Sequence, residues 1–262
     1  MEEGENNKMI VFVYDKTLDG LLSCVFFAYE QKKFPELILS ESDPKPLFAD
    51  ERYYVIAEKE KSIRVWKALE KKLSKFAQNM VLSVWLSELP ETAMLLFRYI
   101  RKNIDHPQGI EMNFGDDDVL RIKDIAQKVG TDARKLIQFI RFQETADGIW
   151  FAPVSPRYNV LSLIAPHFRS RYAGQPWIIY DTMRNTGLYY DTRRVQEISF
   201  AQEDLAELKS DRLDTGKLSD EEAFFQKMWK EYFQSITIKE RINLKLQRQY
   251  MPKRYWKYLP EI

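Results

Sequence analysis

Apolar residues recur in the N-terminal half of the chain with the spacings of both strands and helices. Residues 9–14 form a short apolar run rich in β-formers, which predicts a buried strand. In residues 18–29 the apolar side chains return every three or four positions, as on one face of a helix, and Thr17 or Asp19 can cap its start. The same patterns predict a loop at 34–48, a strand at 53–57, and helices at 62–73 (capped by Ser62), 77–85 and 91–103.

The pattern changes after the glycine- and aspartate-containing stretch 112–118, which we interpret as a loop between two parts of the molecule. Beyond it we expect helices at 119–129, 132–142, 159–172 and 219–235, a strand at 148–153, and a hairpin of strands 177–182 and 187–191. The sequence therefore predicts a helix-rich α+β fold with small sheets. We expect an N-terminal part, residues 1–114, packed closely against a C-terminal part, residues 115–262, which ends in a basic helical tail.

Bulk composition limits the classes of protein to which this chain can belong. Its 262 residues carry a formal net charge of only +1, so any attraction to phosphate has to come from local segregation of charge. The single cysteine, Cys24, excludes an internal disulfide and predicts a reducing, cytoplasmic location. No apolar run reaches membrane-spanning length and the acidic N-terminus is unlike a secretory signal, so we expect no membrane partner.

Charge is segregated most strongly near the C-terminus. An acidic stretch at 203–222 is followed by a tail, residues 239–262, in which basic residues alternate with aromatic rings. The basic residues are Lys239, Arg241, Lys245, Arg248, Lys253, Arg254 and Lys257, and the rings are Tyr250, Tyr255, Trp256 and Tyr258. Cations that pair with phosphates, beside rings that stack on bases, favour a nucleic-acid contact. Two alternatives stay open: the rings dock on the domain, or the tail folds against the acidic stretch.

Residues 121–140 have the spacing of a helix-turn-helix motif, with Gly130 in the turn and Leu136 as an apolar anchor in the second helix. The second helix would present to DNA the side chains of Arg134, Lys135, Gln138 and Arg141. The alternative is a pair of ordinary amphipathic helices, the first closed by Gly130 and the second capped by Thr131 or Asp132.

A second group of charged and aromatic residues lies between positions 157 and 194. Its members are Arg157, His167, Arg169, Arg171, Asp181, Arg184, Tyr189, Tyr190, Asp191, Arg193 and Arg194. His167 and Arg171 are four residues apart and share a helix face, so the group can hold a phosphate. As a catalytic site it would use His167 as the acid–base group, with Asp181 or Asp191 as its carboxylate partner. The alternative is a network of salt bridges where a helix meets a sheet.

Sequence motifs for metals and nucleotides are missing. Two histidines and one cysteine are too few for a Cys/His metal site, and no cysteine motif for a radical iron–sulfur cluster occurs. Neither of the two common glycine-rich nucleotide motifs is present. We therefore predict no metal and no cofactor in this chain.

Six motifs, in a fixed order, carry a resemblance to a known family. They read YDKTLDGLLSCVFFAY (14–29), KLIQFIRF (135–142), APHFRSR (165–171), WIIYDT (177–182), LYYD (188–191) and MPKRYW followed by LPE (251–261). The chain resembles a bacterial family described as probable DNA metabolism or DNA repair proteins, which carries domain of unknown function 4130. The resemblance covers nearly the whole chain. It weakens the helix-turn-helix interpretation, because the second helix there ends in a Phe-x-Arg-Phe motif suited to docking on the next strand.

The resemblance implies a context more than a chemistry. Proteins of that family typically pair with a radical-SAM protein of DNA modification or repair, and in other bacteria a similar module is fused ahead of a uracil-DNA glycosylase-like domain. Because this chain ends after the last motif, we expect any excision or radical chemistry to lie in a partner. Lys16 and Thr17 replace a usual Gly-Ser pair, which makes the loop after the first strand less flexible.

We therefore expect a DNA-binding accessory protein of DNA repair or modification, which presents single-stranded or damaged DNA to a radical-SAM partner. The expected phosphate contacts are Arg141, Arg169, Arg171, Lys245, Arg248, Lys253 and Arg254, and the expected stacking rings are Tyr255 and Trp256. Two other functions stay open. One is a nucleic-acid-processing enzyme that uses His167 and the group at 157–194, and the other is a protein-interaction scaffold without nucleic-acid binding.

Overall fold

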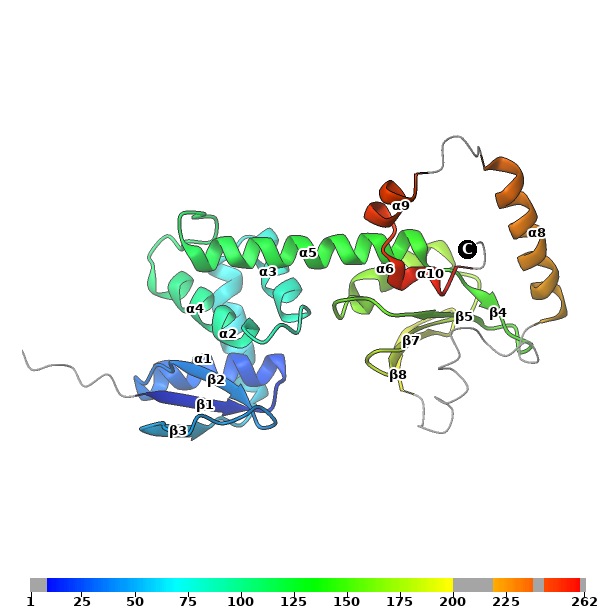
Figure 1. Cartoon of the computed structure of the whole chain (residues 1–262). Coiled ribbons are helices and arrows are strands. Elements are labelled where there is room, and N and C mark those ends of the chain that lie inside the picture. Colours follow the sequence, from blue (N-terminus) through cyan, green and yellow to red (C-terminus); the bar gives the residue numbers. More distant parts are fainter. Residues whose placement is uncertain (1–8, 200–218, 238–242, 260–262) are drawn as a thin grey trace, which may run out of the picture. The chain divides into compact units, whose positions relative to one another are not determined.

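The computed structural model describes residues 9–199, 219–237 and 243–259 (Figure 1). Contacts divide the chain into two compact units, one up to Val129 and the other from Gly130 onward. The division falls inside helix α5 (Asp117–Phe139), whereas the sequence predicted it at the loop before that helix. The mixture of helices and small sheets is the α+β fold that the sequence predicted, and each unit is described by itself below.

The N-terminal unit begins with a three-stranded parallel sheet. The strands are β1 (Ile10–Tyr14), β2 (Leu37–Ser40) and β3 (Glu51–Tyr54), in the order β2-β1-β3. The central strand β1 is the predicted apolar run, and its Val11 and Phe12 are completely buried. Strand β2 lies within the stretch that the sequence assigned to a loop, and β3 begins two residues earlier than predicted.

Four helices accompany this sheet, and two of them, α1 and α3, begin at a short polar residue whose side chain caps them. Their bounds are α1 (Leu18–Gln31), α2 (Lys59–Lys72), α3 (Lys75–Trp85) and α4 (Thr92–Asp105). Thr17 caps α1 as predicted, since its hydroxyl accepts a hydrogen bond from the backbone N–H of Gly20. The prediction that Ser62 caps α2 was wrong: Ser62 is buried in its first turn and donates to Asp19 at 2.6 Å.

Helix α5 corrects the expectation of two helices around Gly130. It runs without a break from Asp117 to Phe139, so this segment has no helix-turn-helix. The physical reason is that the apolar stripe continues across the glycine: Ile122, Val129 and Leu136 recur every seven residues and are all completely buried. A single glycine inside a helix costs only about 1 kcal/mol, which this burial outweighs.

The C-terminal unit contains a five-stranded sheet of order β4-β5-β6-β7-β8. Its strands are β4 (Gln143–Glu144), β5 (Trp150–Val154), β6 (Trp177–Asp181), β7 (Thr186–Tyr190) and β8 (Val195–Ile198). Strands β5 and β6 are parallel and are joined through helix α6 (Leu161–Arg171), while the other pairs are antiparallel. The predicted hairpin is confirmed as β6–β7, where a Cβ on Gly187 would come within 2.7 Å of the Tyr180 ring.

Three further helices follow: α8 (Asp220–Ile236), α9 (Leu244–Tyr250) and α10 (Lys253–Trp256). The end of the basic tail docks on the unit, because Tyr255, Tyr258 and Leu259 are buried. The hydroxyl of Tyr258 lies 3.0 Å from that of Thr182 at the end of β6. Residues 239–242 and 260–262 of the tail, and 203–218 of the acidic stretch, lie outside the described residues. Within the described ranges, no helix has both the length and the apolar character that crossing a bilayer requires.

Candidate nucleic-acid interface

A groove beside α6 is the first element of the candidate site. It has a volume of about 550 Å³ and lies between one face of α6 and strands β7 and β8. The helix contributes Ser162, Ala165 and Arg169, which are spaced by three and four residues, and the strands contribute Tyr190 and Val195. Small side chains on the helix leave the space open, and Arg169 supplies a positive charge at its wall. We call this hollow the α6 groove.

Three arginines lie in the groove wall and in the turn next to it, and we call them the arginine cluster: Arg169, which lines the groove, and Arg193 and Arg194, which precede Val195 in the turn between β7 and β8. The guanidinium of Arg169 donates to the backbone carbonyl of Arg193 at 3.3 Å, which joins α6 to the turn between β7 and β8. All three side chains are exposed. The cluster therefore consists of three exposed arginines on α6 and on the turn that α6 contacts.

Asp191 holds the turn that carries two of these arginines. One of its carboxylate oxygens accepts hydrogen bonds from the backbone N–H groups of Arg193 at 2.9 Å and Arg194 at 2.7 Å. These two bonds lower the pKa of Asp191, so the carboxylate stays charged. Its second oxygen lies 3.6 Å from the guanidinium of Arg194. Asp191 thus positions the cluster and offsets only part of its charge.

His167 and Arg171 lie on a different face of α6 from Arg169. Residues two apart on a helix point about 200° apart, so His167 and Arg169 face nearly opposite directions. The ring of His167 is exposed and packs edge-on against Phe168, with centroids 5.1 Å apart. Among the described residues, no hydrogen bond or ion pair joins His167 to Asp181 or Asp191. The structure therefore does not assemble the acid–base pair that the sequence suggested.

Asp181 is completely buried at the end of β6. Its carboxylate accepts hydrogen bonds from the backbone of Met183 at 2.9 Å and from the guanidinium of Arg184 at 2.8 Å. Burial raises the pKa of Asp181, although Arg184 and the backbone bonds oppose that rise. Arg184 also donates to the carbonyls of Pro156 and Arg157, so this pair ties the hairpin to the β5–α6 loop. The contacts of Asp181 are those of a residue that holds the fold.

Asp132 has a role that the sequence interpretation missed, since it was considered there only as a possible helix cap. It is 4% exposed on α5, and its carboxylate accepts hydrogen bonds from the backbone N–H of Arg157 at 2.8 Å and of Tyr158 at 3.1 Å. The guanidinium of Arg254 and, at 3.0 Å, the hydroxyl of Tyr255 bind its other oxygen. The sequence contains a signal for it: position 132 lies three residues after Val129, on the buried face of the helix.

This contact corrects the expected roles of two tail residues. Tyr255 is only 2% exposed, and its ring packs 5.8 Å from that of Phe139, so it offers no face for a base to stack on. Burial and the neighbouring Asp132 carboxylate raise the pKa of Tyr255, and its hydroxyl therefore keeps its proton. Arg254 is paired with Asp132 and lies over the Tyr255 ring, which directs its charge into the protein.

Three further basic residues of the tail face outward. Lys245, Arg248 and Lys253 are exposed, and Trp256 is half-buried with its indole N–H donating to the carbonyl of Met251 at 3.0 Å. Arg141 donates to the carbonyls of Gln138 and Ile140 and thereby caps the end of α5. No hydrogen bond or ion pair among the described residues joins α9 to the arginine cluster, so these are two separate groups of cations.

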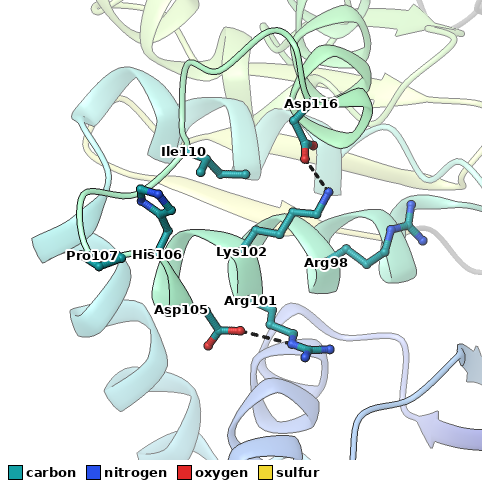
Figure 2. Close-up of a pocket in the computed structure, with 8 residues that line it drawn as sticks. All are labelled: Arg98, Arg101, Lys102, Asp105, His106, Pro107, Ile110 and Asp116. Atoms are coloured by element: carbon teal, nitrogen blue, oxygen red, sulfur yellow. Dashed lines mark hydrogen bonds and ion pairs between the residues drawn. The ribbon is translucent and has the colours of Figure 1, made fainter.

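The N-terminal unit has a cation-rich hollow of its own, shown in Figure 2, which we call the α4 hollow. It measures about 640 Å³ and is lined by residues of α4 and of the loop that follows, Arg98, Arg101 and Lys102 among them. Lys102 lies 2.7 Å from Asp116 and 2.8 Å from Asp118. Arg98 binds both oxygens of Asp118, the closest at 2.7 Å, and Arg101 lies 3.3 Å from Asp105.

The charges of the α4 hollow balance, because three cations face three carboxylates. Burial opposes the ionisation of Asp118, but the ion pairs with Arg98 and Lys102 outweigh it and lower its pKa. Each cation is thus held by a charged acid, and little positive field is left for a ligand. The described residues also contain no group of three or more His, Cys, Asp or Glu side chains that could hold a metal ion.

The fold and the site define a class of protein: an α+β protein with an exposed arginine cluster beside an open groove. The chain belongs to the DUF4130 family, a domain of unknown function, whose sequence model matches residues 90–261. The match covers α4, α5 and the whole described C-terminal unit, including the groove and the cluster. The resemblance to this family that the motifs indicated is therefore confirmed for that range.

Two further comparisons add little. No curated protein matches this chain. A solved structure described as the pGpG-specific phosphodiesterase PggH from Vibrio cholerae aligns with 87% of this chain and 99% of its own, at 11% sequence identity and a TM-score of 0.28. A similarity that weak supports no statement about fold or activity.

Proposed function

We propose that this protein is a DNA-binding accessory factor in DNA repair or modification, and that it presents DNA to a radical-SAM partner. The observation that carries the DNA-binding half is the arginine cluster of Arg169, Arg193 and Arg194. The cluster consists of three exposed arginines, and Asp191, the acid of their turn, already accepts two backbone hydrogen bonds. Guanidinium groups bind phosphate oxygens in a bidentate manner, so such a cluster suits a sugar-phosphate backbone.

The α6 groove supports the same proposal. Its volume of about 550 Å³ falls in the range of small-ligand pockets and is large enough for one nucleotide. Its walls combine small side chains of α6 with Tyr190 and Val195. A backbone phosphate held by the cluster would place its sugar or base at this groove. A base enters such a space only when it is unstacked, which favours single-stranded or damaged DNA.

Exposed Lys245, Arg248 and Lys253 of the tail offer further phosphate contacts, and the half-buried Trp256 is the remaining candidate for stacking. We assign the chemistry to a partner for two reasons. Among the described residues His167 forms no hydrogen bond or ion pair with Asp181 or Asp191, and the family resemblance implies a radical-SAM protein. Both reasons fit a protein that binds DNA while another protein catalyses the reaction.

Fluorescence anisotropy with single- and double-stranded oligonucleotides at several salt concentrations tests the proposal. The decisive variant carries Arg169→Gln, Arg193→Gln and Arg194→Gln. A matched control carries Lys59→Gln, Lys67→Gln and Lys71→Gln, which removes the same charge from exposed positions of α2. Each phosphate contact contributes about −0.7 (single strand) to −0.9 (duplex) to the slope of log affinity against log salt.

We expect the cluster variant to lose about ten-fold or more in affinity at low salt and roughly two units of slope, while the control keeps both. Equal losses in the two variants would show that only the total charge matters. Adding the radical-SAM protein to the wild-type protein and DNA tests the other half. We expect a ternary complex in analytical ultracentrifugation, and a partner that binds neither component would contradict that half alone.

A further inference from the structure

Helix α8 exposes a stripe of large apolar side chains. Phe224 is 61% exposed, Phe225 56%, Met228 48%, Trp229 39% and Tyr232 54%. They are spaced by one, three or four residues, which places all five on one side of the helix. We call this set the α8 stripe. A continuous apolar face on a soluble protein marks a surface that another protein covers.

The helix that carries the stripe is anchored to the C-terminal unit at its beginning. Ser219 caps α8, and its backbone N–H donates to the carbonyl of Glu144 in β4 at 3.1 Å. The carboxylate of Glu222 accepts a hydrogen bond from the N–H of Glu144 at 3.2 Å. Within the stripe the rings pair locally, Trp229 with Tyr232 at 5.8 Å between centroids. The stripe is thus an ordered face at a defined place in the fold.

We propose that two copies of this chain associate through the α8 stripe as an antiparallel helix pair. Three of the five stripe residues are symmetric about its middle: Phe224 lies four residues before Met228 and Tyr232 four residues after it. A twofold axis through Met228 therefore brings Phe224 of one copy opposite Tyr232 of the other. Such an isologous contact uses the same patch twice and closes on itself, as most homodimers do.

The exposed area fits a second copy. An aromatic side chain presents about 150–250 Å², so four of them together with Met228, all roughly half exposed, offer about 500 Å². Two copies would bury about 1,000 Å², which is the lower limit for a specific interface.

Molar mass by light scattering during gel filtration, at several loading concentrations, tests the proposal. We expect the wild-type protein to approach twice the mass of one chain as concentration rises. The double variant Phe225→Ser with Trp229→Ser should keep the mass of one chain at the same concentrations. Phe76→Ser in α3 is the matched control, since that ring is 58% exposed outside the stripe. A wild-type protein that stays at the mass of one chain overturns the proposal.

Cysteine cross-linking tests the orientation and the surface together. The native Cys24 is completely buried and does not interfere. Met228→Cys should form a disulfide between two copies, because the residue lies on the proposed axis. Phe224→Cys mixed with Tyr232→Cys should cross-link to each other and not to themselves. A dimer that none of these cysteines captures would place the interface elsewhere and would overturn the assignment to α8.

Discussion

The α4 hollow and the arginine cluster contain the same number of cations but offer a ligand very different charge. In the α4 hollow, Asp118 is buried and its carboxylate oxygens bind Arg98 and Lys102. In the cluster, Asp191 is partly exposed and one of its oxygens accepts hydrogen bonds from backbone N–H groups. The first carboxylate neutralises cations, and the second positions them. The number of basic residues therefore does not identify an anion-binding site. Whether the cations are available to an anion depends on which groups the nearby carboxylates bind.

The same difference predicts where each region is vulnerable. Cations held by buried acids contribute mainly to stability, because breaking such a pair leaves a charge without its partner. Cations that face solvent contribute little to stability and are available for binding. The predictions below test this contrast, from the largest expected effect to the smallest.

Asp118→Asn should have the largest effect, since it removes the carboxylate shared by two cations of the α4 hollow. We expect the free energy of unfolding to fall by about 2 kcal/mol, less than for a fully buried pair because Arg98 is partly exposed. Urea unfolding measures the loss. Asp124→Asn is the control: it removes an exposed acid that pairs with Arg121 and Lys128, and should cost about 0.5 kcal/mol or less.

The same Asp118→Asn variant should also gain affinity for an anion, which the Asp124→Asn control should not. With its shared acid gone, the α4 hollow carries one more positive charge than negative, and inorganic phosphate should then stabilise the variant in thermal unfolding more than the wild-type protein. Equal stabilisation of both proteins by phosphate would mean that ion pairing is not what keeps this hollow from binding anions.

Arg193→Glu should have the next largest effect, on binding rather than on stability. Reversing one charge in the cluster places an acid beside Arg169 and Arg194, so we expect DNA affinity to fall by about ten-fold at low salt. Arg101→Glu makes the same change in total charge in the α4 hollow, and we expect it to stay within about two-fold of wild type. Anisotropy titrations of both variants, with circular dichroism to confirm folding, compare the regions directly. A ten-fold loss in both variants would remove the contrast.

Much of the fold was predictable because local patterns determine it. The apolar run of β1, the capped helix α1 and the β6–β7 hairpin each carry their own signal within a short stretch of sequence. Strand β2 was missed because only alternate residues of it are buried and its partner β1 lies more than twenty residues away. Gly130 misled the interpretation of α5, since the glycine is a weak signal compared with the apolar stripe that crosses it.

The site was predictable in its residue types but not in its grouping. The sequence singled out the charged group at 157–194, and within that group the structure joins Arg169 to the turn that carries Arg193 and Arg194. Helix spacing puts Arg169 and His167 on different faces, but the sequence could not show which face of α6 meets β7 and β8, because that depends on long-range packing. For the same reason Tyr255 appeared as exposed as Trp256, until Asp132, more than a hundred residues earlier, was found to bind it.

Acid titration compares two buried carboxyls with opposite behaviour. Burial opposes the ionisation of Asp118, but its ion pairs prevail and lower its pKa, whereas burial raises the pKa of Asp181. A carboxyl whose pKa is lowered in the folded state stabilises the protein at pH values above its unfolded pKa of about 3.9. That contribution is lost as the pH falls through the folded pKa. The pKa shift of Asp181 has the opposite sign, so the contribution of Asp181 to stability decreases as the pH rises from its unfolded pKa through its folded pKa.

We therefore expect the stability gap between wild type and Asp118→Asn to shrink as pH falls below the unfolded pKa of about 3.9. For Asp181→Asn the gap should shrink as pH rises above that same value. Urea unfolding at stepped pH measures both. A gap that moves in the same direction for the two variants would contradict the assigned causes.

Asp105→Asn should have the smallest effect, although it also breaks an ion pair in the α4 hollow. The pair of Arg101 with Asp105 joins side chains that are 42% and 48% exposed, and pairs of that kind contribute about 0.5 kcal/mol or less. Arg101 also keeps its place over the Phe34 ring, 3.8 Å from the centroid, so losing the acid does not free its charge. We expect urea unfolding to shift little and phosphate to bring no added stability. A loss as large as that of Asp118→Asn would mean that pairing by itself, and not burial of the acid, sets the contribution of these cations to stability.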